Sequence, residues 1–313
     1  TKLLLENGCQ LSVGDKESWT ALHHAVQKRS IEIVTTLLDH KAPVDAQEGG
    51  GKTPLMLAAR RGHPELIKLL ISNYGAYVNK TDNNNRTALA DAVEKRNYEA
   101  IKVLLDHGAD TDIQTNEGKT PLMIAVDVYD LEIIKLLLKS NCDVSLHNKE
   151  GLSALDVAVI KGKESAVKLL AAKTHLRKMK IIGKTPLNWA VNKQIVPIVK
   201  LLLESGCSVN AIDSVGRSAL HEASSKGHAG IAMYLIEKKI NIDHQDHQGI
   251  TPLMIAVKRN HSDIVALLMK HGCDVNIKDK RGRSAWSRVG PNTSEAIEKA
   301  FIAQSSLDHA EKT

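Results

Sequence analysis

The chain has 313 residues, a formal net charge of +6, four cysteines and only 3% aromatic residues. It contains no run of about 18 apolar residues that could span a membrane as a helix, and no secretory signal sequence is visible at its start. Its first residues, TKLLLENG, are typical of the end of a helix, so we expect the chain to be a fragment of a longer protein.

A phrase of the form G-K-T-P-L recurs along the chain, and each copy predicts the start of a helix. In GKTPLMIAV, residues 118–126, the hydroxyl of Thr120 can cap a helix, and Pro121 suits the first helical position. The Thr or Ser at this place, here called the marker, recurs every 32 to 34 residues. The markers are Thr20, Thr53, Thr87, Thr120, Ser153, Thr185, Ser218, Thr251 and Ser284.

This period of about 33 residues, together with the motif T-P-L-H-x-A, resembles the ankyrin repeat family. The copies at His23 and His221 keep the family's L-H-x-A, whereas Met56, Met123 and Met254 replace the histidine. The resemblance implies an all-α solenoid of paired antiparallel helices with projecting β-hairpin fingers. It also implies a hydrogen bond between repeats at each histidine, which is in question where methionine stands.

We expect one array rather than several globular domains, because each repeat packs only on its neighbours. A partial repeat at 1–14 is followed by eight full repeats, a degenerate capping repeat at 279–302 and a polar tail at 303–313. The full repeats are 15–47, 48–81, 82–114, 115–147, 148–179, 180–212, 213–245 and 246–278.

Two places depart from the repeat pattern. One extra residue near Asn73 and Tyr74 predicts a bulge at the end of a helix. The segment 171–182 is one residue short, lacks the usual finger ending and carries Lys173, Arg177 and further lysines. It is interpreted either as a degenerate, solvated finger or as a bend or contact site, and we expect it to be the weakest interface of the array.

The cysteines indicate packing rather than chemistry. Cys9, Cys142, Cys207 and Cys273 occupy the same repeat slot, which alanine fills elsewhere, and they lie whole repeats apart. Because no C-x₂-C pair occurs, a zinc site is not expected, and unpaired cysteines favour a reducing compartment, the cytoplasm or nucleus. The polar stretch 243–248, DHQDHQ, could take up a metal but is interpreted as an ordinary finger, so we expect no metal and no cofactor.

Positive charge recurs at two positions of the repeat. The helix-end row lies just before the turn between the two helices, and comprises Lys28, Arg61, Lys95, Val128, Lys161, Lys193, Lys226 and Arg259. The pre-marker row lies just before each marker, and comprises Trp19, Lys52, Arg86, Lys119, Leu152, Lys184, Arg217, Ile250 and Arg283. The resemblance implies that both rows line the concave binding face, so they predict a basic groove. The alternative is that these cations are merely solvated.

Trp19 and Trp189 are the candidate hydrophobic anchors of that groove, because tryptophan is enriched at interface hot spots. Trp189 is equally consistent with packing between repeats. The resemblance further implies that Asn210 and Asn276 are possible substrates of an asparaginyl hydroxylase that acts on ankyrin repeats, since Leu202 and Leu268 precede them by eight residues.

We expect a non-catalytic, monomeric scaffold for protein–protein interaction that binds an acidic or extended partner segment. No nucleophile elbow, phosphate-binding loop or H-E-x-x-H motif argues for an enzyme. The alternative is a nucleic-acid or oligonucleotide sensor, since residues 19–27 resemble part of the ankyrin sensor domain of the oligoadenylate-dependent ribonuclease. Few aromatic residues are present to stack on bases, which disfavours that alternative.

Overall fold

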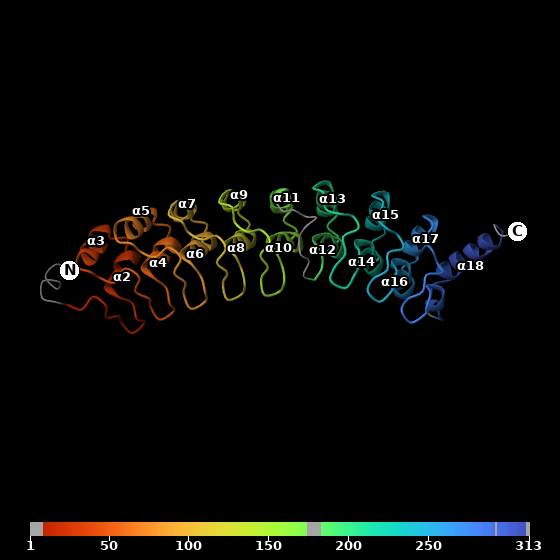
Figure 1. Cartoon of the computed structure of the whole chain (residues 1–313), viewed down its shortest axis with the longest axis horizontal. Helices are drawn as coiled ribbons and strands as arrows, with labels where there is room; N and C mark the ends of the chain where they lie inside the picture. Colours follow the sequence, from red (N-terminus) through yellow and green to blue (C-terminus); the bar gives the residue numbers. More distant parts are fainter. Residues whose placement is uncertain (1–8, 174–182, 292, 311–313) are drawn as a thin grey trace. The chain divides into compact units, whose positions relative to one another are not determined.

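The computed structural model describes residues 9–173, 183–291 and 293–310. The chain divides into two compact units, Thr1–Val157 and Ala158–Thr313. In each unit, the first helices of successive repeats lie side by side, the second helices cover one side of them, and the fingers project on the opposite side (Figure 1). Paired helices with projecting fingers are the architecture predicted from the repeat period.

The helices of the first unit follow the sequence period. Its first helices pack on one another in chain order, and each also packs on the second helix of its own repeat. The elements are α2 (Ala21–Gln27), α3 (Ile31–Asp39), α4 (Pro54–Arg61), α5 (Pro64–Lys68), η1 (Leu69–Asn73), α6 (Ala88–Glu94), α7 (Tyr98–Asp106), α8 (Pro121–Val128) and α9 (Leu131–Lys139). Helix α10 (Ala154–Ile160) crosses the boundary between the units.

The second unit repeats the arrangement and ends in a helix longer than the others. Its elements are α11 (Glu164–Lys173), α12 (Pro186–Asn192), α13 (Val196–Glu204), α14 (Ala219–Lys226), α15 (Ala229–Glu237), α16 (Pro252–Arg259), α17 (Ser262–Lys270), η2 (Trp286–Arg288) and α18 (Glu295–Ala310). Helix α18 packs on α17, with Ile297 and Phe301 buried. It runs past residue 302, where the polar tail was expected to begin.

The markers act as the predicted helix caps. The Thr53 hydroxyl accepts the N–H of Met56 at 3.3 Å, and the Thr185 hydroxyl accepts that of Asn188 at 2.9 Å. A proline opens the helix in α4, α8, α12 and α16. Leucine and alanine side chains beneath these caps are almost fully buried, as at Leu55 and Ala58, so small residues let the helix layers approach closely.

Several of the described fingers are closed by a side chain rather than by paired strands. In four repeats an aspartate stands five residues before the marker, and one of its carboxylate oxygens accepts two backbone N–H groups of the turn. These residues are Asp82, Asp213, Asp246 and Asp279. Two residues before the marker, glycine usually supplies the positive φ of the turn, as at Gly216 (φ +81°). Within the described ranges, the only strand-like pairing is an isolated antiparallel bridge between Ile212 and Ser218. The fingers are therefore turns more than β-hairpins.

The two departures from the repeat have different outcomes. The extra residue near Asn73 is accommodated as a π-helical turn, η1, which confirms the predicted bulge. Of segment 171–182, only its first three residues lie in α11; the rest lie outside the described residues, so its weakness stays a prediction. Among the described helices, none is long and apolar enough to cross a bilayer.

Candidate functional site

The helix-end row provides exposed positive charge in both units. Arg61, Lys226 and Arg259 are the last residues of their helices, and Lys28, Lys95 and Lys193 are the C-caps of theirs. All six residues are exposed. In the part of the chain that the structure describes, none of the six side chains forms an ion pair. These charges are free to meet a partner, although the negative end of each helix also favours a cation there.

The pre-marker row is different, because its cations are held by carboxylates of the chain itself. Lys52 and Arg86 meet at one buried carboxylate, Asp91 of α6, with Nζ–Oδ2 and Nε–Oδ1 distances of 3.0 Å. Lys52 also contacts Asp82 at 3.0 Å, and Arg86 contacts Glu94 at 3.2 Å. Burial opposes the charge of Lys52, but Asp91 and Asp82 outweigh it and raise the pKa of the ammonium group. Lys52 therefore joins its repeat to the next one, whereas Arg86 is held within its own repeat.

Further cations of the pre-marker row are also paired with carboxylates of the chain. Lys119 contacts Glu117 at 2.9 Å and Asp127 at 3.2 Å. Lys184 contacts Glu222 at 2.8 Å, and Arg217 contacts Asp246 at 3.4 Å. Of the two predicted rows, the helix-end row supplies the six exposed cations without a described ion pair, so the prediction of a basic groove now depends on those six residues.

The two tryptophans are both partly buried and already have neighbours. Trp19 packs against His23 and His24, with ring centroids 5.9 and 5.2 Å apart. The ammonium group of Lys184 lies over the ring of Trp189, 5.4 Å from its centroid. Neighbouring side chains of the chain cover part of each ring, so the role of the two tryptophans as partner anchors stays a prediction.

The implied hydrogen bond between repeats is present where the sequence keeps histidine. His23 Nε2 lies 3.1 Å from the carbonyl oxygen of Lys52, and His221 Nε2 lies 2.9 Å from that of Ile250. Asn188 occupies the same position and donates its side-chain N–H to the carbonyl of Arg217 at 3.0 Å. Asparagine thus replaces histidine in this bond, which sequence reasoning missed.

Two acidic residues that the sequence analysis did not single out bind lysines of the pre-marker row. Asp91 and Glu222 both stand four residues after a marker, and each accepts the lysine of the preceding repeat's pre-marker position. The signal was available in the sequence, because the spacing from Lys52 to Asp91 is nearly the spacing from Lys184 to Glu222. Recognising it requires knowing that these two positions meet across the interface.

The cysteines and the histidine-rich finger show no arrangement for chemistry. Burial raises the pKa of the Cys142 and Cys207 thiols to about 11 and that of Cys273 to about 12, so these thiols are poor nucleophiles. Cys142 and Cys273 fill the buried slot as predicted, whereas Cys9 is exposed. Within the described ranges, no group of three His, Cys, Asp or Glu side chains is placed to hold a metal ion.

The two candidate hydroxylation sites lie on exposed finger ends. Asn210 accepts the N–H of Asn241 at 2.7 Å, whereas the leucines that precede the two sites, Leu202 and Leu268, are fully buried. An enzyme that reads those leucines must therefore wait for the repeat to open. We expect incubation with the asparaginyl hydroxylase to add one oxygen to Asn276 or Asn210, measured by mass spectrometry of the peptides. Peptides without added oxygen would refute this.

Comparison with known proteins supports the repeat assignment over most of the chain. A family model described as ankyrin repeats (3 copies) matches residues 1–82, 40–115, 75–146, 122–213 and 198–279. The chain is 35% identical over 115 residues to the putative ankyrin repeat protein FPV222 of Fowlpox virus (strain NVSL), 36% identical over 114 residues to neurogenic locus notch homolog protein 1 of Mus musculus and 36% identical over 113 residues to the putative palmitoyltransferase ZDHHC13 of Danio rerio.

Each of these matches covers 36% of the chain. It covers 15% of the viral protein, 4% of the notch homolog and 17% of the palmitoyltransferase. The similarity therefore concerns the repeats that these proteins contain.

Proposed function

The chain belongs to the ankyrin repeat family, and on that premise we propose that it is a non-catalytic scaffold that binds a protein partner through its helix-end row. Stacked repeats offer extended surfaces for binding. The observation that carries the proposal is the difference between the rows: pre-marker cations are compensated within the chain, while six helix-end cations are exposed without an ion pair among the described residues, namely Lys28, Arg61, Lys95, Lys193, Lys226 and Arg259. The partner segment is accordingly acidic and extended, following neighbouring first helices.

Charge reversal on the first unit tests this proposal. We expect the double variant Arg61→Glu, Lys95→Glu to slow association with a captured partner about tenfold at low salt and to flatten its salt dependence, because exposed charges act mainly on association. Partners would be captured with the whole chain, and association rates would be measured at several salt concentrations. The melting curve should stay close to that of the unchanged chain.

A matched control carries the same charge change on the second helices. Lys68 and Lys139 are exposed on α5 and α9, and Lys139 ends its helix as Arg61 does. The variant Lys68→Glu, Lys139→Glu should leave association unchanged. If this control slows binding as much as the Arg61 and Lys95 pair, net charge rather than the helix-end row is responsible, and the proposal fails.

Oligonucleotide binding is the alternative function for the same positive charge. It requires aromatic platforms for the bases, but the rings of Trp19 and Trp189 are partly covered by neighbours of the chain. A salt titration separates the two functions, because a phosphate-backbone binder loses affinity steeply and in proportion to the number of phosphates neutralised. Preference for a single-stranded oligonucleotide over every protein partner would favour the alternative.

A further inference from the structure

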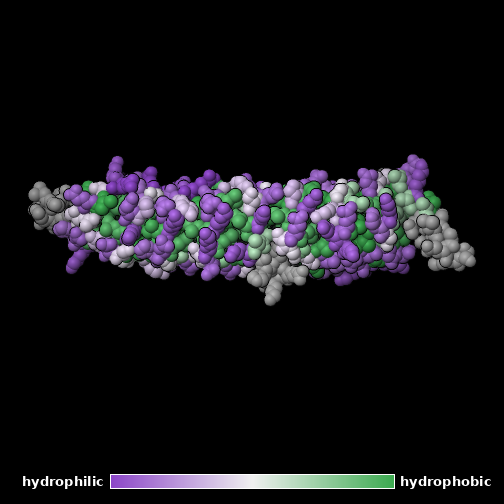
Figure 2. Space-filling view, turned by 90° about the horizontal axis from the view of Figure 1, so that it is seen from above, coloured by the Kyte–Doolittle hydropathy of each residue, from purple (hydrophilic) through white to green (hydrophobic). Residues whose placement is uncertain are grey.

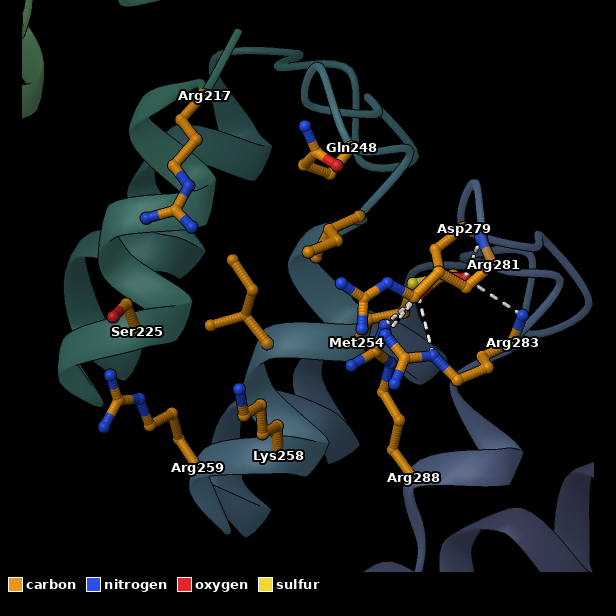
Figure 3. A pocket seen from close by; sticks show the side chains of 12 residues that line it. Arg217, Ser225, Gln248, Met254, Lys258, Arg259, Asp279, Arg281, Arg283 and Arg288 are labelled. Atoms are coloured by element: carbon orange, nitrogen blue, oxygen red, sulfur yellow. Dashed lines mark hydrogen bonds and ion pairs between the residues drawn. The ribbon is translucent and has the colours of Figure 1, made fainter. Parts of the chain in front are cut away.

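A cavity of about 290 Å³ lies at the C-terminal end of the second unit. It is formed by α14, α16, the fingers that precede α16 and η2, and η2 itself (Figure 3). Arg217 enters from one side, and the side chains around Asp279 gather on the other. Six cations line it: Arg217, Lys258, Arg259, Arg281, Arg283 and Arg288. Asp279 is the one carboxylate among the described lining residues.

The charge of this cavity is not balanced by the chain. Asp279 already accepts the side chains of Arg283, at 3.0 Å, and Arg288, besides closing its finger turn. Arg217 is paired with Asp246, which does not line the cavity. Even with Asp246 counted, cations outnumber carboxylates by four. Lys258, Arg259 and Arg281 form no ion pair with any described residue.

One of these cations is buried as well as incompletely bonded. The side chain of Arg288 is only 10% exposed, and its Nε is buried without a hydrogen-bond partner among the described residues. Burial lowers the pKa of this guanidinium group, and the neighbouring Arg283 charge acts in the same direction. A buried cation without full compensation is costly, so an anion from outside the chain would stabilise the site.

A cavity in the first unit shows that this charge is not a general property of the repeats. This cavity, of about 420 Å³, lies at corresponding repeat positions, but there Arg86 and Lys119 face acidic residues. Glu94 and Asp127 each stand seven residues after a marker, and Glu117 stands three residues before one. The second unit has Ser225, Lys258 and Gln248 at those three positions, and Arg281, three residues before the next marker, adds a further cation.

The composition of the cavity selects the kind of anion. Five of its six cations are arginines, whose planar guanidinium groups bind phosphate in a bidentate manner. A phosphate monoester carries close to two negative charges, which suits the excess. The lining residues include no aromatic ring on which a base could stack. Arginine clusters of this kind recognise phosphorylated protein segments, whereas a nucleotide lacks its platform here.

We propose that this cavity binds the phosphate group of a phosphorylated serine or threonine carried by a protein segment. The inference rests on the proposed function in one respect, namely that the ligand is part of a protein. It does not depend on the helix-end row of the first unit.

Fluorescence anisotropy with three degenerate pools of labelled heptapeptides tests the proposal on the whole chain. The pools are identical except for a central phosphoserine, serine or glutamate. We expect the phosphoserine pool to bind at least tenfold more tightly than the other two, and inorganic phosphate to compete. Equal binding of all three pools would overturn the inference, as would tighter binding of a single-stranded oligonucleotide than of the phosphoserine pool.

Two substitutions locate the binding. Arg259→Gln and Arg281→Gln remove cations that form no described ion pair, so folding should be retained and checked by melting. Each should weaken phosphoserine binding about tenfold, the value of one charge-assisted hydrogen bond. Lys280→Gln is the matched control, because Lys280 is exposed in the same finger but does not line the cavity. A loss as large in the control would refute the site.

The experiments separate this inference from the proposed function. If the phosphoserine pool fails to bind while the Arg61 and Lys95 variant still slows association with a captured partner, only the phosphate site is wrong. If phosphoserine binds and that variant has no effect, the helix-end row of the first unit does not bind the partner, and the proposal for the cavity stands.

Discussion

Replacing Asp91 with asparagine should lower the free energy of unfolding by about 3 kcal/mol, the loss typical of breaking a buried ion pair from one side. The Asp91 side chain is fully buried, and its carboxylate oxygens accept hydrogen bonds from Lys52 and Arg86 at 3.0 Å. Arg60 forms a longer ion pair with the same carboxylate, at 3.7 Å. The side chains of Lys52 and Arg86 are 25% and 19% exposed, so water replaces the lost carboxylate poorly. Asparagine keeps the volume of the side chain and removes only its charge. Urea unfolding followed by circular dichroism measures the change.

A surface pair provides the contrast for this prediction. Glu99 contacts Lys102 at 3.3 Å on α7, and both side chains are exposed. Glu99→Gln should change stability by less than about 0.5 kcal/mol. If Asp91→Asn costs no more than Glu99→Gln, the buried carboxylate does not join the repeats. Adding Lys52→Met to Asp91→Asn should restore part of the stability, because it removes a half-buried cation that has lost one of its two carboxylates.

The sequence predicted the framework of this interface because local rules and the repeat period point to the same structure. Caps at Thr53 and Thr120, and prolines at the first helical position, follow from backbone chemistry alone. The bond between repeats at His221 followed from the family resemblance. Each of these features repeats with the period, so one correct alignment of the markers places all of them.

The sequence did not predict which charges are free. The distinction between Lys52 and Arg61 depends on side chains in the next repeat, such as Asp91, 39 residues after Lys52, which approach only after the helices have stacked. Where the fourth residue after the marker is Val157 instead of an acid, Lys119 takes Glu117 and Asp127 as partners. The cavity in the second unit is a further case, because its six cations come from five different repeat positions, and the repeat period alone does not show that these positions surround one cavity.

The space-filling view shows how polar and apolar residues are distributed on one face of each unit. Within each unit, the visible face is mainly hydrophilic, with hydrophobic residues showing between the polar ones (Figure 2). Specific recognition by such a surface depends on charge placement more than on a large apolar patch. This agrees with our proposals that the partner is selected by exposed cations of the helix-end row and by the C-terminal cavity.

Acidification should destabilise the folded chain through His221, and the hydrogen bonds of its ring explain why. The backbone N–H of Ser218 donates to Nδ1 at 3.2 Å, so Nδ1 must be the unprotonated nitrogen. Nε2 therefore carries the hydrogen and donates it to the carbonyl of Ile250 at 2.9 Å. A second proton would have to sit on Nδ1 and face the Ser218 N–H, inside a site with no exposed surface.

The direction and size of the effect follow from this geometry. Burial lowers the pKa of His221 from 6.5 to about 4, although the Ile250 carbonyl partly offsets the shift. The unfolded chain binds a proton at this histidine below about pH 6.5, whereas the folded chain does so only near pH 4. Stability is therefore complete above pH 6.5 and falls as the pH drops toward 4, by about 3 kcal/mol from this group. Burial also lowers the pKa of His23, which adds a loss of the same sign.

Another repeat of the chain suggests a variant that isolates the contribution of His221 to the pH dependence of stability. Asn188 occupies the same repeat position and makes the same bond to a carbonyl without a titrating group. His221→Asn should be somewhat less stable than the unchanged chain at pH 7.5, and the difference should shrink or reverse by pH 4, because only the unchanged chain loses the histidine contribution. Urea unfolding of both chains between pH 7.5 and 4 measures the difference. In parallel, NMR signals of the His221 ring should stay unchanged until the pH falls below about 5. A stability difference that is constant across this range, or a ring that titrates near pH 6.5 in the folded chain, would show that the bond between repeats tolerates a charged imidazole.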